Sequence, residues 1–115
     1  MKKVDQGHIT IDELTQMAQA MYGNLVKAVV DLKRNVMVVD AEMHADEEQF
    51  LLEDGSQQND LWGINLHPAK FGKDEFIEFD SMINIRPRQQ NMSRDVEDKA
   101  IRRQITELVN GKVAA

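Results

Sequence analysis

The sequence contains no cysteine, and this absence excludes a whole class of chemistry. Disulfide bridges, thiolate nucleophiles and thiolate metal ligands are ruled out, so a metal site would need histidine and carboxylate ligands. No hydrophobic run approaches the roughly 18 apolar residues of a membrane span. The start, residues 1–5 (MKKVD), turns polar before the apolar region of a signal peptide could form. We therefore expect a cytoplasmic protein without membrane contact.

Basic residues are too few for a general nucleic-acid binder. The chain has 14 Lys and Arg against 20 Asp and Glu, a net charge of −6 at pH 7, whereas phosphate contacts need a basic surface. The charge is also uneven. Residues 1–60 carry five basic and twelve acidic side chains, and residues 61–115 carry nine and eight. The second half is thus where an anion would bind.

The length and apolar content are those of one folded domain. The 115 residues are 42% hydrophobic and 30% charged, which is enough apolar surface to form one core. We expect a single α+β domain over residues 1–115, with a frayed tail at about 112–115.

Three helices are predicted from apolar residues at helical spacing. Thr10 and Glu13 form a capping-box pattern before a helix at about 11–22. Acidic residues 46–48 suit the start of a second, short helix, which Gly55 ends. A third helix is predicted at about 95–109.

Alternating residues predict two pairs of strands. Segments 25–32 and 36–39 form a hairpin, 61–67 is a strand ended by a proline, and 76–86 is the strongest alternation. The order α-ββ-α-ββ-α indicates an antiparallel four-stranded sheet with helices on one face. The other face would be polar and serve as a solvated surface, a ligand platform or a homodimer interface. Its outward residues would be Lys27, Asp31, Asp40, Glu42, Asn65, His67, Glu78, Asp80, Asn84 and Arg86.

No established catalytic or cofactor-binding motif is present, but one short acidic segment suggests a metal. If residues 42–46 (EMHAD) are extended, Glu42, His44 and Asp46 lie on one side. Carboxylate and imidazole ligands suit zinc, manganese or iron. The alternative is that His44 enters a helix and bonds to backbone. No cofactor is otherwise evident.

A second cluster, at 84–94, gathers arginines before the last predicted helix. Its candidate ligand-binding residues are Asn84, Arg86, Asn91, Ser93 and Arg94. Arginine side chains and the free N–H groups of a helix start both favour an anion. The structural alternative is that the asparagine or serine caps the helix while the arginines pair with its acidic residues.

Trp62, the only tryptophan, alternates with Ile64 and Leu66. This spacing predicts that the indole packs in the core. The alternative is a stacking platform for a base or a sugar.

The segments 51–58 (LLEDGSQQ), 61–68 (LWGINLHP) and 76–87 (FIEFDSMINIRP), followed by Asn91 and Ser93, resemble a family of small uncharacterised bacterial proteins defined as a domain of unknown function. The resemblance covers about residues 26–109. It implies no activity, substrate or fold, but it suggests that both clusters are family motifs.

Two departures from that family pattern affect the clusters. The family stretch Gly-Gly-Glu-x-His-x-Asp corresponds to residues 40–46, where Asp40 and Ala41 replace the glycines. The family Asn-Arg-Ser loop reads Asn91-Met92-Ser93, so one candidate anion contact is absent.

Two functions follow as hypotheses. The first is a non-catalytic binding or interaction module, whose polar sheet face and Arg-rich loop hold an anionic small molecule or a protein partner. The second is a small metal-dependent hydrolase or nuclease that uses Glu42, His44 and Asp46. We prefer the first.

Overall fold

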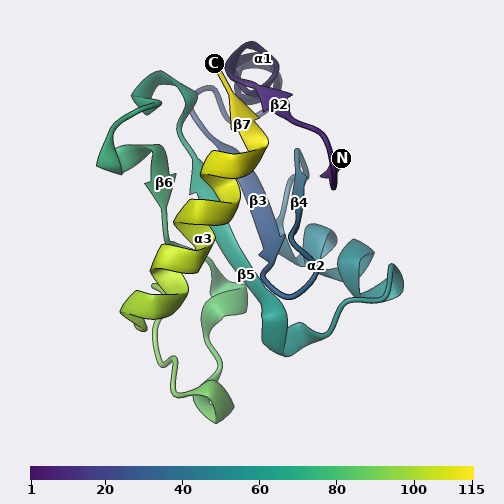
Figure 1. Cartoon of the computed structure of the whole chain (residues 1–115), viewed down its shortest axis with the longest axis vertical. Helices are drawn as coiled ribbons and strands as arrows, with labels where there is room; N and C mark the ends of the chain where they lie inside the picture. Colours follow the sequence, from purple (N-terminus) through teal and green to yellow (C-terminus); the bar gives the residue numbers. More distant parts are fainter.

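The computed structural model describes all 115 residues and is built on a five-stranded antiparallel sheet (Figure 1). The α+β class predicted from the sequence is confirmed. The expected number of four strands is wrong, because the N-terminal segment adds an edge strand. In spatial order the strands are β1 (Lys2–Val4), β4 (Val36–Val39), β3 (Val26–Asp31), β5 (Leu61–Leu66) and β6 (Ile77–Glu78).

Three α-helices accompany the sheet, namely α1 (Ile11–Ala20), α2 (His44–Glu53) and α3 (Lys99–Lys112). The predicted capping box at the start of α1 is present. Helix α3 begins later than residue 95 because the Asp98 side chain caps it. None of the three is long and apolar enough to cross a membrane.

The two ends of the chain are held together by a small parallel sheet. Strand β2 (Ile9–Thr10) pairs with β7 (Val113–Ala114). Figure 1 shows both termini at the same end of the molecule. The expectation of a frayed tail at about 112–115 is therefore wrong, because backbone pairing and a buried Val113 hold it.

Helices cover both faces of the sheet, which corrects the expectation of helices on one face. Helices α1 and α3 pack on the face formed by alternate residues such as Ala28 and Ile64. Helix α2 packs on the opposite face, where Leu51 contacts a cluster that includes Val29 and Val38. Strand β4 is apolar on both faces, a pattern typical of strands that are covered on both sides, whereas β3 carries Lys27, Val29 and Asp31 on its second face. On this second face, Lys27 and Asn65 lie beside the start of α2 and line a pocket there.

The long strand predicted at 76–86 is mostly absent, because polar side chains compete with strand pairing. Only β6 pairs with β5, and turns follow at Met82–Asn84 and Pro87–Gln89. The Ser81 hydroxyl accepts the N–H of Ile83, and the Asn84 side chain bonds to both the N–H and the C=O of Gly63. Such local side-chain bonds replace the ladder that a strand backbone would make.

Gly63 is the position on β5 where this turn approaches most closely. A Cβ built there would lie 2.6 Å from the Ser81 Cβ. We expect Gly63→Ala to lower the free energy of unfolding by about 1–3 kcal/mol, as overpacking does in a rigid core. Denaturant unfolding measures this. Gly111→Ala is the matched control, since a Cβ there meets nothing within 4 Å in a helix; equal losses in the two variants would contradict the prediction.

Candidate functional site

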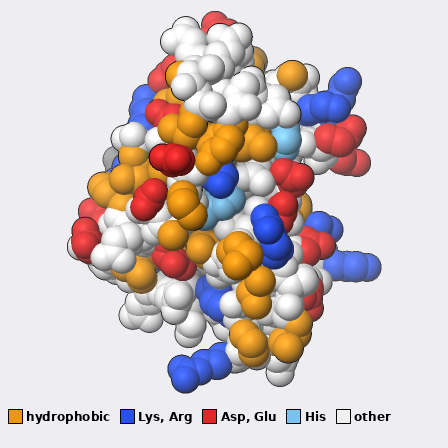
Figure 2. Space-filling view, turned by 180° about the vertical axis from the view of Figure 1, so that it is seen from behind, with side chains coloured by type: hydrophobic (Ala, Val, Ile, Leu, Met, Phe, Trp, Pro, Cys, Tyr) orange, Lys and Arg blue, Asp and Glu red, His pale blue; other side chains and the backbone are white.

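A pocket of about 140 Å³ opens beside the start of α2. It lies on the second face of the sheet, where polar positions of β3 and β5 are left uncovered. Figure 2 shows the side of the molecule away from α3, on which basic and histidine side chains lie among hydrophobic ones. The pocket is lined by Lys27, Met43, His44, Ala45, Asn65, Asp80, Ser81, Met82, Ile83 and Arg94.

Two basic side chains contribute positive charge to the pocket. Lys27 stands opposite Asn65 in the register of β3 and β5, and no acidic side chain pairs with its ammonium, which lies 5.0 Å from the centre of the Tyr22 ring. The Arg94 Nε donates to Asp80 Oδ1 at 2.6 Å, and its other guanidinium nitrogens make no hydrogen bond. Lys27 is thus an unpaired cation and Arg94 keeps free donors.

His44 forms one wall of the pocket as a neutral imidazole. Its Nε2 lies 2.7 Å from the carbonyl oxygen of Ile64, and a carbonyl only accepts, so Nε2 carries the hydrogen. Burial lowers the pKa of His44, and the Lys27 charge lowers it further. His44 therefore contributes no charge at neutral pH.

The N-terminus of α2 also opens into the pocket. Met43 at the N-cap provides no side-chain hydrogen bond, and the N–H groups of His44 and Ala45 have no acceptor. Free N–H groups and the helix dipole give this end a partial positive charge. Burial raises the pKa of Glu47 in the same turn to about 9, so that carboxyl adds no negative charge at neutral pH.

Asn65 places an unsatisfied acceptor beside the pocket. The residue is 6% exposed, and its Nδ2 donates to Glu78 Oε1 and to the Asp80 carbonyl oxygen at 3.0 and 3.3 Å. Its Oδ1 is buried without any partner. Native proteins rarely leave a buried polar atom unpaired, because desolvation without a hydrogen bond costs about 1–3 kcal/mol.

The three residues predicted as metal ligands are not brought together. His44 turns inward to Ile64, whereas Glu42 and Asp46 are exposed. Helix α2 begins at His44, and residues two apart in a helix do not share a side. No group of three or more His, Asp or Glu side chains lies close enough to hold a metal ion.

Two residues of the 84–94 cluster serve the loop itself. Asn84 and Asn91 are buried. The Asn91 amide donates to the carbonyl oxygens of Asn84, Ser93 and Asp95, and its Oδ1 accepts the N–H of Glu97. These contacts satisfy both asparagines internally and fix the path of the chain toward α3.

The remaining members of the cluster separate. Ser93 donates to Glu97 Oε2 at 2.8 Å. Arg86 donates to the carbonyl oxygens of Gln58 and Leu61, and its guanidinium lies 4.2 Å from the Trp62 ring centre. Trp62 is 2% exposed, so its predicted place in the core is confirmed. Among the five candidates, only Arg94 lines the pocket.

The LLEDGSQQ segment forms a structural network. Asp54 pairs with Lys3 and Arg34, each at 2.8 Å. The Ser56 hydroxyl donates to the buried Asp31 carboxylate and accepts from Arg34, both at 2.6 Å. These bonds fasten the end of α2 to the β3–β4 hairpin.

Lys27 and Asn65 were missed as site residues by sequence reasoning. Both belong to the outward alternation predicted for the sheet face, which was the available signal. The sequence does not show where α2 stops covering that face. It therefore could not distinguish Lys27 and Asn65 from the other eight outward residues predicted for the face.

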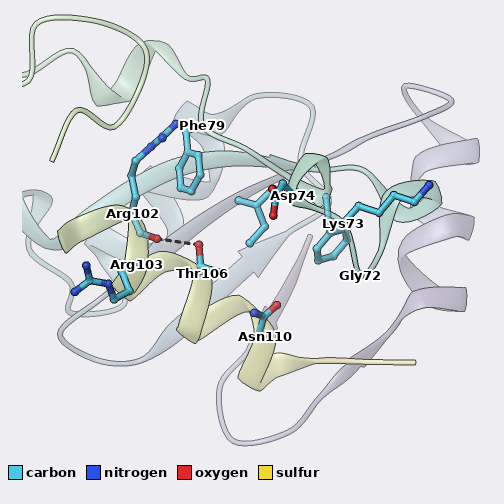
Figure 3. Close-up of a pocket in the computed structure, with 10 residues that line it drawn as sticks. Gly72, Lys73, Asp74, Phe79, Arg102, Arg103, Thr106 and Asn110 are labelled. Atoms are coloured by element: carbon cyan, nitrogen blue, oxygen red, sulfur yellow. Dashed lines mark hydrogen bonds between the residues drawn. The ribbon is translucent and has the colours of Figure 1, made fainter. Parts of the chain in front are cut away.

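A larger cavity of about 580 Å³ lies between α3 and residues 72–79. Figure 3 shows that Arg102 extends toward Phe79 while Arg103 points in another direction. Arg102 also pairs with Asp95 at 3.1 Å, and Lys73 and Arg103 are exposed. The basic side chains of this larger cavity thus do not point toward a common ligand position. The smaller pocket beside α2 is therefore the stronger candidate site.

Comparison with curated proteins found no match, and neither did comparison with solved structures. One family model matches nearly the whole chain, which confirms the predicted resemblance to a family of unknown function. The chain belongs to the family described as Protein of unknown function (DUF5674), whose model matches residues 3–112.

Proposed function

We propose that this chain is a non-catalytic binding module that holds a small anion in the pocket at the start of α2. The observation that carries the proposal is that the unpaired Lys27 ammonium, the free guanidinium N–H groups of Arg94 and the uncapped N-terminus of α2 meet at one pocket. Guanidinium forks and helix N-termini are the groups that proteins use to bind carboxylates and phosphates.

The composition of the pocket supports binding rather than turnover. Covalent catalysis needs a nucleophile within hydrogen-bond reach of a base. The His44 Nε2–H is held by Ile64, and the Ser81 hydroxyl accepts the N–H of Ile83 instead of contacting an imidazole. The wall thus offers charge and hydrogen-bond donors without an activated nucleophile.

Replacement of Lys27 tests the proposal. Lys27→Met keeps most of the side-chain volume and removes the unpaired charge. We expect it to weaken acetate or phosphate binding about ten-fold, since a hydrogen bond to a charged group contributes roughly 1.5–3 kcal/mol. Amide NMR titration measures the affinity and locates the ligand, with the largest shifts expected at Ala45 and Asn65.

Lys33→Met is the matched control, because Lys33 is exposed, lies at the β3–β4 turn and is absent from the pocket. It should leave the affinity within about two-fold of the original, as surface charges contribute little. The proposal fails if Lys27→Met and Lys33→Met bind equally well, or if the ligand shifts α3 and leaves α2 unchanged.

A further inference from the structure

Building on the proposed function, we infer that the ligand is the free C-terminal residue of a peptide. Three features of the pocket favour this ligand. The lining side chains carry one net positive charge, the buried Asn65 Oδ1 lacks a hydrogen-bond donor, and Met43 and Met82 form an apolar rim. A peptide C-terminus supplies a carboxylate, an adjacent amide N–H and an apolar side chain within one residue.

The charge of the pocket favours a singly charged anion. Among the side chains that line the pocket, Lys27 and Arg94 are positive, Asp80 is negative, and His44 is neutral, while Glu78 and Asp46 lie outside the lining. One net positive charge matches a carboxylate better than a phosphate dianion. A free amino acid fits less well, because its ammonium group would lie near two cations, whereas the amide of a peptide is uncharged.

The unpaired Asn65 Oδ1 favours a ligand that also donates a hydrogen bond. This oxygen is buried beside the pocket and nothing in the chain donates to it. The amide N–H next to a terminal carboxylate is a donor a few ångströms from the charge. Because Oδ1 is covered in the free protein, ligand binding at this oxygen requires that a side chain beside it moves.

The rim extends the site beyond the carboxylate. The pocket volume of about 140 Å³ suits a small group such as a carboxylate with its adjacent amide. Met43 and Met82 flank it and are 56% and 66% exposed. Methionine is unbranched and adapts to many apolar shapes, so these two side chains would contact the terminal side chain.

A set of small ligands separates the three features, with binding to the full chain measured by amide NMR. N-acetyl-L-leucine carries all three, 4-methylpentanoate lacks the N–H, N-acetyl-L-leucine amide lacks the carboxylate, and L-leucine has an ammonium group. We expect N-acetyl-L-leucine to bind about ten-fold more tightly than 4-methylpentanoate and L-leucine, and the amide to show no saturable binding.

A double variant, Met43→Ser with Met82→Ser, tests the rim. Both side chains are exposed, so the fold should be unaffected. We expect N-acetyl-L-leucine to lose about five-fold in affinity while acetate is unchanged. Met92→Ser is the control, since Met92 is 65% exposed and lies outside the pocket.

The outcomes distinguish this inference from the proposed function. If acetate and N-acetyl-L-leucine bind equally, or if phosphate or L-leucine binds most tightly, the peptide inference is wrong while the anion site stands. If no anion binds in a way that depends on Lys27, both are wrong. The inference is also wrong if the double variant prefers N-acetyl-L-leucine over acetate as strongly as the original chain does.

Discussion

Glu47→Gln is expected to stabilise the protein at pH 8 and to remove much of the pH dependence of its stability. Glu47 has no exposed surface. Its Oε2 accepts the N–H of Ala41 at 3.1 Å, and its Oε1 has no partner. Glutamine has nearly the same shape, retains an acceptor for Ala41 and cannot ionise.

The direction of the effect follows from proton binding. Burial raises the pKa of Glu47 from 4.5 to about 9 in the folded chain. Between these two values the folded chain holds a proton that the unfolded chain has released. The free energy of unfolding therefore falls as pH rises from 4.5 to 9, by at most about 1.4 kcal/mol per pH unit. The contribution is fully present below pH 4.5.

Denaturant unfolding of both proteins at pH 5, 6.5 and 8 measures this. We expect the difference in the free energy of unfolding between Glu47→Gln and the original chain to grow in favour of the variant by roughly 3 kcal/mol from pH 5 to pH 8. Glu53→Gln, an exposed carboxyl in the same helix, is the control and should leave the pH profile unchanged. If the free energy of unfolding changes with pH equally in Glu47→Gln and in the original chain, the buried Glu47 carboxyl is not held neutral in the folded state.

Asn84→Asp is expected to have the largest effect among replacements in the 84–94 cluster. Asn84 has no exposed surface. Its Oδ1 accepts the Gly63 N–H at 2.9 Å, and its Nδ2 donates to the carbonyl oxygens of Gly63 and Arg94 at 2.9 and 3.0 Å. Aspartate preserves the shape but faces two carbonyl oxygens with a buried charge. We expect a loss of about 3–5 kcal/mol at pH 7, comparable to an uncompensated buried charge.

The same variant should recover stability in acid. Once protonated, the carboxyl that Asn84→Asp introduces is neutral and donates one hydrogen bond, so the loss relative to the original chain should shrink as pH falls from 7 to 4. Asn24→Asp, at an exposed position, is the control. A loss below about 1 kcal/mol at pH 7 would mean that the side chain of Asn84 is not the link between β5 and the loop.

The sequence determined the elements whose signals are local. The Thr10 and Glu13 capping box placed α1, because both side chains bond within the first turn. Alternation placed β3, β5 and the buried Trp62, and the apolar run 36–39 placed β4 as the partner of β3 in a hairpin. These signals need no partner outside their own segment, so they could be interpreted before any fold was known.

The tertiary structure decided what depends on contacts between distant segments. The alternation at 76–86 predicted a strand, but the Asn84 side chain bonds to Gly63, 21 residues away, and the chain turns instead. The alternation also could not show that α2 would cover part of the second face. That packing depends on apolar residues from four elements, β3, β4, α2 and β5.

The candidate site shows the same division. The sequence placed His44 in one cluster and Arg94 in another, and it gave Lys27 and Asn65 only as two of ten outward residues of the sheet face. These four residues line one pocket because β3 and β5 are neighbours and α2 ends its cover beside them. Residue chemistry is a property of the sequence, whereas the meeting of unpaired charges depends on strand order and helix packing, which are set by long-range burial of apolar surface.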